Sequence, residues 1–246
     1  MTARAEVYKP RCAVRVVTAT SLFDGHDAAI NIMRRILQAT GAEVIHLGHN
    51  RSVHEIVDAA VEEDAQGIAV SSYQGGHIEF FKYMVDLLKE KGAPHIKVFG
   101  GGGGVILPEE AQELEAYGVE KIYSPEDGVH HGLQGIINDL VKRIDFPTLE
   151  SGSDFELDQL QPINKPLVAK LISAMELAKT EENGHLARLR AHISQRLKER
   201  IIPVVGITGT GGAGKSSLTD ELILRFLNDF KEINIGILST DPSRRK

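Results

Sequence analysis

Residues 13–33 read AVRVVTATSLFDGHDAAINIM, an apolar strand followed by a short loop and the start of a helix. The loop contains Asp24 and His26, separated by one residue. A histidine that binds a metal through one ring nitrogen usually donates its other N–H to a carboxylate. The pair therefore predicts a metal ligand with its orienting carboxylate. The alternative is that Asp24 is the N-cap of a helix that contains His26.

The pattern around this stretch predicts a flavodoxin-like α/β fold with a five-stranded parallel sheet. Short β-branched runs alternate with amphipathic segments, which is typical of a parallel sheet with helices on both faces. The expected strands lie near 13–19, 43–47, 67–72, 96–100 and 120–123. In the strand order 2-1-3-4-5, ligands bind outside the carboxyl ends of strands 1 and 3.

The sequence pattern also predicts how the chain divides into domains. We expect a ligand-binding domain over 1–145, a linker over 146–163 that is rich in Pro, Gly, Ser and acids, and a helical arm over 164–200. Residues 201–246 have a strand-loop-helix-strand pattern, the start of a P-loop α/β domain. Because so short a segment buries little surface, we expect the sequence to be a fragment of a longer chain.

Composition and charge limit the kinds of partner and the compartment that we expect. The net charge is −6 and Lys and Arg are scattered, so we expect no nucleic-acid partner. No apolar run reaches the ~20 residues needed to span a bilayer, so we expect no membrane partner. Cys12 is the only cysteine, and the first residues have no apolar signal-peptide core. These features predict a cytoplasmic protein without an internal disulfide.

Small or hydroxylic residues follow strands 3, 4 and 5, in the segments 71–77, 100–104 and 124–128. Such residues let a large flat ligand approach the backbone and hydrogen-bond to it. A phosphoacceptor receiver domain is excluded, because it needs an aspartate where this chain has Ser71. A flavin domain is disfavoured, because the bulk and charge of residues 22–24 would oppose a flavin phosphate.

The motifs Asp24-Gly25-His26-Asp27, Ser71-Ser72-Tyr73 and Gly103-Gly104 together resemble the cobalamin-binding domain of the methylmalonyl-CoA mutase class. The resemblance implies adenosylcobalamin as cofactor, with His26 as the lower cobalt ligand, Asp24 as its support and the displaced nucleotide tail in the cleft. Two positions depart from the family pattern, Ala29 in place of glycine and Tyr73 in place of leucine. The implied cofactor-binding residues are Asp24, Gly25, His26, Asp27, Ser71, Ser72, Tyr73, His77, Gly102, Gly103, Gly104, Ser124 and Gly128.

A second motif, GTGGAGKS at residues 209–216, fits the phosphate-loop pattern between an apolar run and an amphipathic helix. The glycine backbone would hold phosphates, Lys215 would reach the β and γ phosphates, and Ser216 would bind Mg²⁺. Asp241 is a further candidate for the magnesium site, although a turn with Pro242 explains it nearly as well. The predicted nucleotide-binding residues are Gly209, Gly211, Gly212, Ala213, Gly214, Lys215, Ser216 and Ser217.

With residues 240–243 this motif resembles the metallochaperone GTPases that attend cobalamin mutases, which implies GTP with Mg²⁺. The two halves together resemble adenosylcobalamin-dependent acyl-CoA mutases with an internal GTPase domain. That resemblance implies radical isomerisation of a short branched acyl-CoA, gated by GTP hydrolysis, in a homodimer. The acyl-CoA would bind a C-terminal barrel, so no catalytic residue is expected in these residues. The alternative is a non-enzymatic cobalamin carrier or sensor coupled to an NTPase.

Overall fold

The computed structural model describes residues 6–26, 28–149, 161, 164–177, 184–197 and 202–240. The chain forms two compact units, Met1–Asn183 and Gly184–Lys246, and each is described by itself below. The linker predicted over 146–163 lies mostly outside the described residues. Its first residues pack onto the first unit, where the Phe146 carbonyl accepts a hydrogen bond from the Gln66 side chain (3.2 Å).

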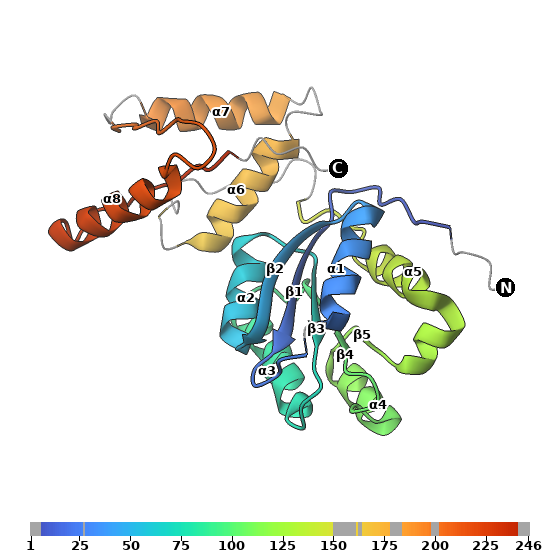
Figure 1. Ribbon diagram of the computed structural model, residues 1–246. Helices are drawn as coiled ribbons and strands as arrows, with labels where there is room; N and C mark the ends of the chain where they lie inside the picture. The colour runs from blue at the N-terminus through green and yellow to red at the C-terminus, as the bar shows by residue number, and fades with distance from the viewer. Residues whose placement is uncertain are drawn as a thin grey trace. The chain divides into compact units, whose positions relative to one another are not determined.

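A parallel five-stranded sheet forms the centre of the first unit (Figure 1). Its order, β2-β1-β3-β4-β5, is the predicted flavodoxin-like order. The β-branched and small apolar residues of the inner strands β1 and β3 are almost completely buried, because helices cover both faces. The strands are β1 (Arg15–Ser21), β2 (Glu43–Arg51), β3 (Gly67–Ser71), β4 (Lys97–Gly101) and β5 (Lys121–Tyr123).

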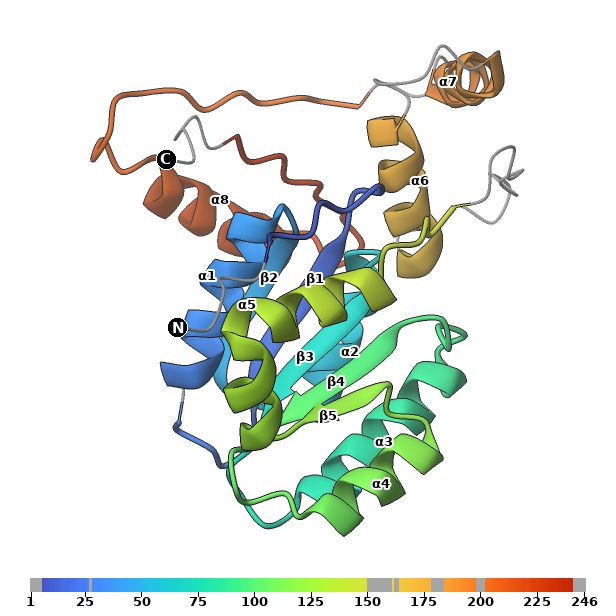
Figure 2. The same cartoon turned by 90° about the vertical axis from the view of Figure 1, so that its right-hand side faces the viewer.

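Helices cover the two faces of the sheet unequally (Figure 2). The helices α1 (Ala28–Thr40) and α5 (Pro125–Arg143) lie on one face, and their apolar residues pack with Phe99 of β4. The helices α2 (Val53–Glu62), α3 (His77–Glu90) and α4 (Pro108–Tyr117) lie on the other, around Phe81. The capping box that the sequence predicts at Ser52 is present at the start of α2.

Strand register brings the predicted ligand-binding segments together. Ser71 of β3 pairs with Thr20 of β1 on one side and with Gly101 of β4 on the other, and Gly101 pairs with Tyr123 of β5. Paired residues in a parallel sheet point to the same face, so all four lie on the face covered by α1 and α5. The carboxyl ends of β1, β3, β4 and β5 thus form one edge.

The helix α6 (Lys165–Leu177) belongs to the first unit, although the sequence places it in a separate arm over 164–200. It packs against α2, where Lys165 forms an ion pair with Glu62 (2.5 Å). Its Ser173 accepts a hydrogen bond from Arg15 at the beginning of β1 (2.6 Å), and Arg15 also pairs with Glu176. The buried face of α6 explains this placement, because Ala169 and Leu171 need a partner surface.

The second unit contains α7 (Gly184–Leu197) and α8 (Lys215–Asp229), of which α8 begins where the sequence predicts. The prediction of flanking strands is wrong, because residues 202–209 and 232–240 form no strand. A strand needs a neighbouring strand to satisfy its backbone groups, and neither segment forms a strand pair with any described residue. Val204 and Leu238 are consequently 90% and 95% exposed.

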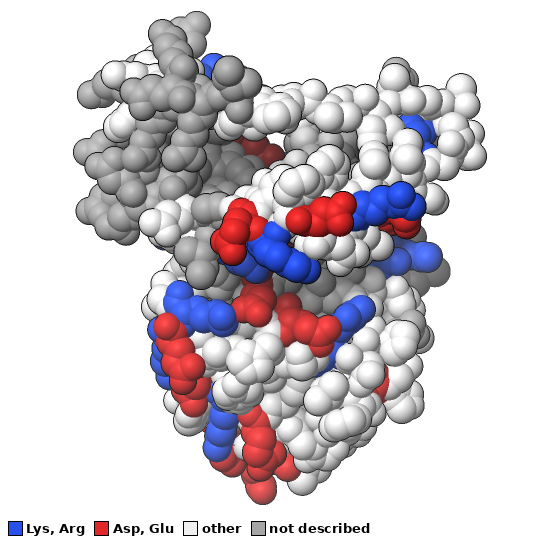
Figure 3. Space-filling model, turned by 90° about the vertical axis from the view of Figure 1, so that its left-hand side faces the viewer, with Lys and Arg blue, Asp and Glu red and all other residues white. Residues whose placement is uncertain are grey.

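Charges of both signs alternate on the face shown in Figure 3. In the first unit, ion pairs join different elements, as between Lys91 and Asp58 (2.9 Å). Such mixing gives no broad field of one sign on this face. No helix in the described part of the chain is long and apolar enough to cross a membrane.

Candidate functional site

The loop after β1 holds His26 through the carboxylate of Asp24. One carboxylate oxygen of Asp24, Oδ1, accepts hydrogen bonds from the backbone N–H of His26 (2.9 Å) and from its ring nitrogen Nδ1 (2.8 Å). The other oxygen accepts from the backbone N–H of Tyr73 (2.5 Å). Because α1 begins at Ala28, His26 precedes that helix. The Asp24 carboxylate instead joins the loop after β1 to the loop after β3. The N-cap alternative is therefore wrong.

Asp24 is ionised at neutral pH. Burial of its carboxyl group opposes ionisation, but the hydrogen bonds from His26 and Tyr73 outweigh this effect and lower the pKa. Since a carboxylate only accepts hydrogen bonds, Nδ1 of His26 must carry a proton. In the neutral imidazole the lone pair is then on Nε2, and the side chain is 76% exposed. His26 is arranged to coordinate a metal through Nε2.

The loop after β3 is braced against the loops after β1 and β4. The Ser72 hydroxyl accepts a hydrogen bond from the Ser21 hydroxyl (2.9 Å). The backbone N–H of Ser72 donates one to the Gly101 carbonyl (2.8 Å). His77 is buried, with Nδ1 at 3.1 Å from the Gln74 carbonyl and Nε2 at 3.0 Å from Glu110. These contacts fix the loops around the site.

Two glycines after β4 are required by close contacts with the loop after β3. A Cβ atom on Gly102 would lie 2.0 Å from the Ser72 carbonyl oxygen. Gly103 has a φ of +57°, and a Cβ there would lie 2.8 Å from the Tyr73 ring. A Cβ on Gly104 would meet nothing within 4 Å. Only Gly102 and Gly103 are therefore needed for the approach of the two loops.

A cavity of about 410 Å³ opens between this edge of the sheet and the helices α1 and α5. Its walls are mainly apolar, and its side-chain hydroxyls come from two serines and two tyrosines. Tyr123 donates its hydroxyl proton to Asp139, and the Ser124 hydroxyl is held by Asp127. The Ser71 hydroxyl makes no hydrogen bond to any described residue, so it remains available to a ligand. The cavity is lined by Ala29, Ile30, Ile32, Met33, Leu37, Ala69, Val70, Ser71, Tyr73, Phe99, Gly100, Gly101, Gly102, Gly103, Tyr123, Ser124, Pro125, Gly128, Leu133, Ile136, Ile137 and Leu140.

The glycine-rich loop of the second unit forms the turn that precedes α8. Gly212 and Gly214 have φ values of +77° and +79°, which glycine adopts readily. The ammonium of Lys215 donates a hydrogen bond to the Thr210 carbonyl (2.9 Å). Ser216 and Ser217 are exposed in the first turn of α8. Asp241 lies outside the described residues.

Comparison with known proteins identifies the family. The B12 binding domain family matches residues 14–123. The chain is 59% identical over 244 residues to a fused isobutyryl-CoA mutase from Geobacillus kaustophilus, covering 98% of this chain and 22% of that protein. It is 58% identical over 238 residues to one from Cupriavidus metallidurans, covering 96% and 21%. It is also 33% identical over 109 residues to the 2-hydroxyisobutanoyl-CoA mutase small subunit of Aquincola tertiaricarbonis, covering 44% of this chain and 79% of that subunit.

The chain belongs to the fused isobutyryl-CoA mutase family. It spans about a fifth of the length of the fused relatives, 22% in the Geobacillus protein. The part that this chain covers contains the cobalamin-binding domain of the family.

The residues of the site fit cobalamin. Its corrin ring supplies four nitrogen ligands to cobalt, so one imidazole from the protein is sufficient. Among the described residues, no group of three or more His, Cys, Asp or Glu side chains could hold a metal ion. His26 offers Nε2 on an exposed ring. The cavity nearby lies against the sheet and is largely apolar, which suits a heterocyclic tail. Both donor and cavity match the group.

The predicted cofactor-binding residues of this chain fall into three groups. Asp24, Gly25 and His26 form the loop after β1, whereas Asp27 lies outside the described residues. Six line the cavity, namely Ser71, Tyr73, Gly102, Gly103, Ser124 and Gly128. Ser72, His77 and Gly104 do not line it. Ser72 and His77 instead brace the loops, because their polar groups are already paired within the protein.

Sequence reasoning missed the apolar walls of the cavity. These side chains come from α1 and α5, for example Ile30, Met33 and Leu133. The predicted strand order carries the signal that could have found them, because helices after the first and last strands of this order cover the same face. Ala29 also lines the cavity, at the position where the family pattern has glycine.

Proposed function

We propose that the full-length protein isomerises isobutyryl-CoA to n-butyryl-CoA with adenosylcobalamin bound by the first unit. The observation that carries this proposal is the buried Asp24 carboxylate, which fixes the exposed His26 ring beside an apolar cavity. The chain shares 59% identity with a fused isobutyryl-CoA mutase, which supports the choice of substrate. The acyl-CoA would bind a barrel that is not part of this sequence.

The residues of this chain have separate tasks in the proposal. His26 would donate its Nε2 lone pair to cobalt, while Asp24 keeps the proton on Nδ1 and raises the basicity of the ring. The cavity lined by Ser71 and Ser124 would take the nucleotide tail, and its apolar walls would exclude water from it. When bound, the cofactor supplies the radical chemistry of the rearrangement.

Electron paramagnetic resonance of the chain loaded with cob(II)alamin tests the assignment of His26. We expect nitrogen splitting from a protein imidazole, which changes when histidine is labelled with nitrogen-15. The splitting should disappear in His26→Ala and persist in His130→Ala, a matched control on an exposed residue of α5. Protein imidazole splitting that survives in His26→Ala would show that another residue binds cobalt.

We infer in addition that the glycine-rich loop at 209–216 binds GTP with Mg²⁺ and that GTP hydrolysis gates cofactor loading. The left-handed glycines at 212 and 214 and the start of α8 at Lys215 support phosphate binding, because backbone N–H groups at a helix start favour anions. Fluorescent GTP and ATP analogues test the proposal. Lys215→Ala should weaken binding of the GTP analogue at least 10-fold, whereas Lys231→Ala should leave it unchanged. Equal binding to both variants would refute it.

A further inference from the structure

Tyr73 contacts both members of the pair in the loop after β1. Its ring centroid lies 5.4 Å from that of His26, with the two planes inclined at 41°. Its backbone N–H donates a hydrogen bond to Asp24. Aromatic rings at this separation attract one another and restrict each other's rotation. The imidazole is thus held by the Asp24 carboxylate at Nδ1 and by the Tyr73 ring at its side.

Tyr73 also forms part of the cavity wall, whereas His26 does not. The Tyr73 ring packs so closely on Gly103 that a Cβ on Gly103 would lie 2.8 Å from Tyr73 Cε1. The neighbouring Gly102 packs against the carbonyl oxygen of Ser72 in the same loop. Because backbone confines the ring on the Gly103 side, a ligand in the cavity limits its remaining freedom. Tyr73 is therefore in contact with the cavity and with the metal-binding ring.

We propose that Tyr73 is a positioning residue that couples occupation of the cavity by the nucleotide tail to coordination by His26. This inference rests on the proposed cobalamin function of the site. A tail that fills the cavity presses the rigid Tyr73 ring against the imidazole and holds Nε2 in its binding orientation. Without the tail nothing in the cavity holds the ring in this contact, so the ring restrains the imidazole less. The chain thereby favours a complete cobamide over a corrinoid that lacks the tail.

The test measures affinities of two corrinoids, cobalamin and the tail-less cobinamide, for wild-type protein and three variants. In Tyr73→Leu the aromatic contact is lost, so cobalamin affinity should fall about 2- to 10-fold. Cobinamide affinity should change little, because its complex leaves the cavity empty. The ratio of the two affinities therefore falls. Tyr73→Phe keeps the ring and should keep the wild-type ratio.

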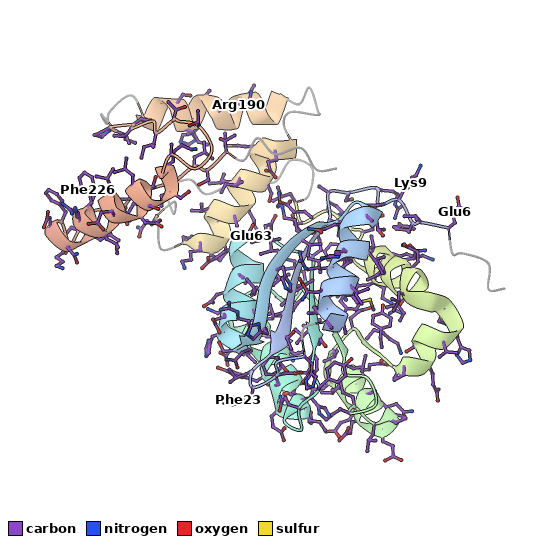
Figure 4. The ribbon with its side chains drawn as sticks, viewed as in Figure 1. Glu6, Lys9, Phe23, Glu63, Arg190 and Phe226 are labelled. Carbon is purple, nitrogen blue, oxygen red and sulfur yellow. The ribbon has the colours of Figure 1, made fainter. Side chains whose placement is uncertain are left out.

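Phe23→Leu is the matched control, because it removes an aromatic ring from the loop that carries His26. Phe23 is 85% exposed at the edge beyond β1 and makes no ring contact with any described residue (Figure 4). We expect the wild-type ratio in this variant. Nuclear magnetic resonance of the His26 ring nitrogens in the cofactor-free protein adds a second readout. Tyr73→Leu should keep the wild-type share of the Nδ1–H form, because the Asp24 carboxylate fixes that proton. A lowered share would mean that the substitution disturbs the loop and not the coupling.

The outcomes separate the two proposals. If wild-type protein shows no imidazole coordination to cob(II)alamin, the proposed function of His26 fails. If coordination is present but Tyr73→Leu weakens both corrinoids equally, Tyr73 only stabilises the loop and the coupling is refuted. A wild-type ratio in Tyr73→Leu refutes it as well. A lowered ratio in Tyr73→Leu with a preserved ratio in Tyr73→Phe supports the coupling.

Discussion

The two glycine-rich loops of this chain differ in what surrounds them. In the first unit, β4 ends at Gly101 between β3 and β5, and its loop packs directly against the loop after β3. In the second unit, the loop at 209–214 forms its turn and α8 begins at Lys215, yet the segment before the loop pairs with no described residue. The same kind of sequence thus lies in a packed edge in one unit and beside exposed apolar residues in the other.

This difference separates local from non-local determinants of a binding loop. Positive φ values at Gly212 and Gly214 and the start of a helix depend on interactions within a few residues. A strand depends on partners distant in sequence, and its side chains stay exposed when those partners are missing. A phosphate-loop motif therefore identifies a turn and a helix start by itself, but it does not determine whether the flanking strands form.

The largest effect should come from Gly102→Ala, at the packed loop of the first unit. The new Cβ would lie 2.0 Å from the Ser72 carbonyl oxygen, so two backbone segments must move apart. We expect the free energy of unfolding of the first unit to fall by about 3 kcal/mol or more. Urea unfolding followed by near-ultraviolet circular dichroism measures it.

Gly104→Ala is the matched control, because its Cβ would meet nothing within 4 Å. Its effect on the free energy of unfolding should stay within about 0.5 kcal/mol. Equal losses in both variants would show that the loop after β4 is not packed as described, and the contrast with the second unit would disappear.

The sequence predicted the features that follow from periodicity and chemistry. Alternation of apolar runs was sufficient for the order of five strands, and the spacing of Asp24 and His26 was sufficient for their pairing. It could not show that Gly102 is required by a neighbouring carbonyl, because that contact joins two loops distant in the chain. For the same reason it could not show that both ring nitrogens of His77, a predicted cofactor-binding residue, are paired within the protein.

A second prediction concerns the boundary between the two units. Leu171 of α6 is 6% exposed in the first unit, so Leu171→Ala should lower its free energy of unfolding by about 2 kcal/mol. Ile172, the next residue, is 54% exposed, and Ile172→Ala should cost less than about 0.5 kcal/mol. Hydrogen exchange should also speed up in α2 for Leu171→Ala alone. Unchanged hydrogen exchange in α2 would mean that α6 does not pack on the first unit and belongs to a separate arm.

A third, smaller effect is expected from Asp24→Asn and depends on pH. The hydrogen bonds to the Asp24 carboxylate outweigh its burial and lower its pKa in the folded protein. A lowered pKa stabilises the fold above the unfolded value of about 3.9, and this contribution disappears as pH falls through the folded value. The variant should therefore lose about 1–2 kcal/mol at pH 7, where an amide cannot accept all the hydrogen bonds.

Urea unfolding of wild type and Asp24→Asn between pH 7 and pH 3 checks the sign. The difference in free energy of unfolding should be constant near neutrality and shrink as the pH drops below about 4. A difference that grows toward low pH would mean that folding raises the pKa of the Asp24 carboxyl group and does not lower it. Asp24 would then be a poor partner for the Nδ1 proton of His26.

The smallest effect is expected in the second unit. Val204 is 90% exposed, so Val204→Ala should change the free energy of unfolding by less than about 0.5 kcal/mol. Val16 of β1 is fully buried, and the same substitution there leaves a cavity that costs about 2 kcal/mol. Urea unfolding measures both variants. Equal losses of unfolding free energy in the two variants would mean that residues 202–209 are packed in solution as tightly as β1. The difference described between the surroundings of the two glycine-rich loops would then be wrong.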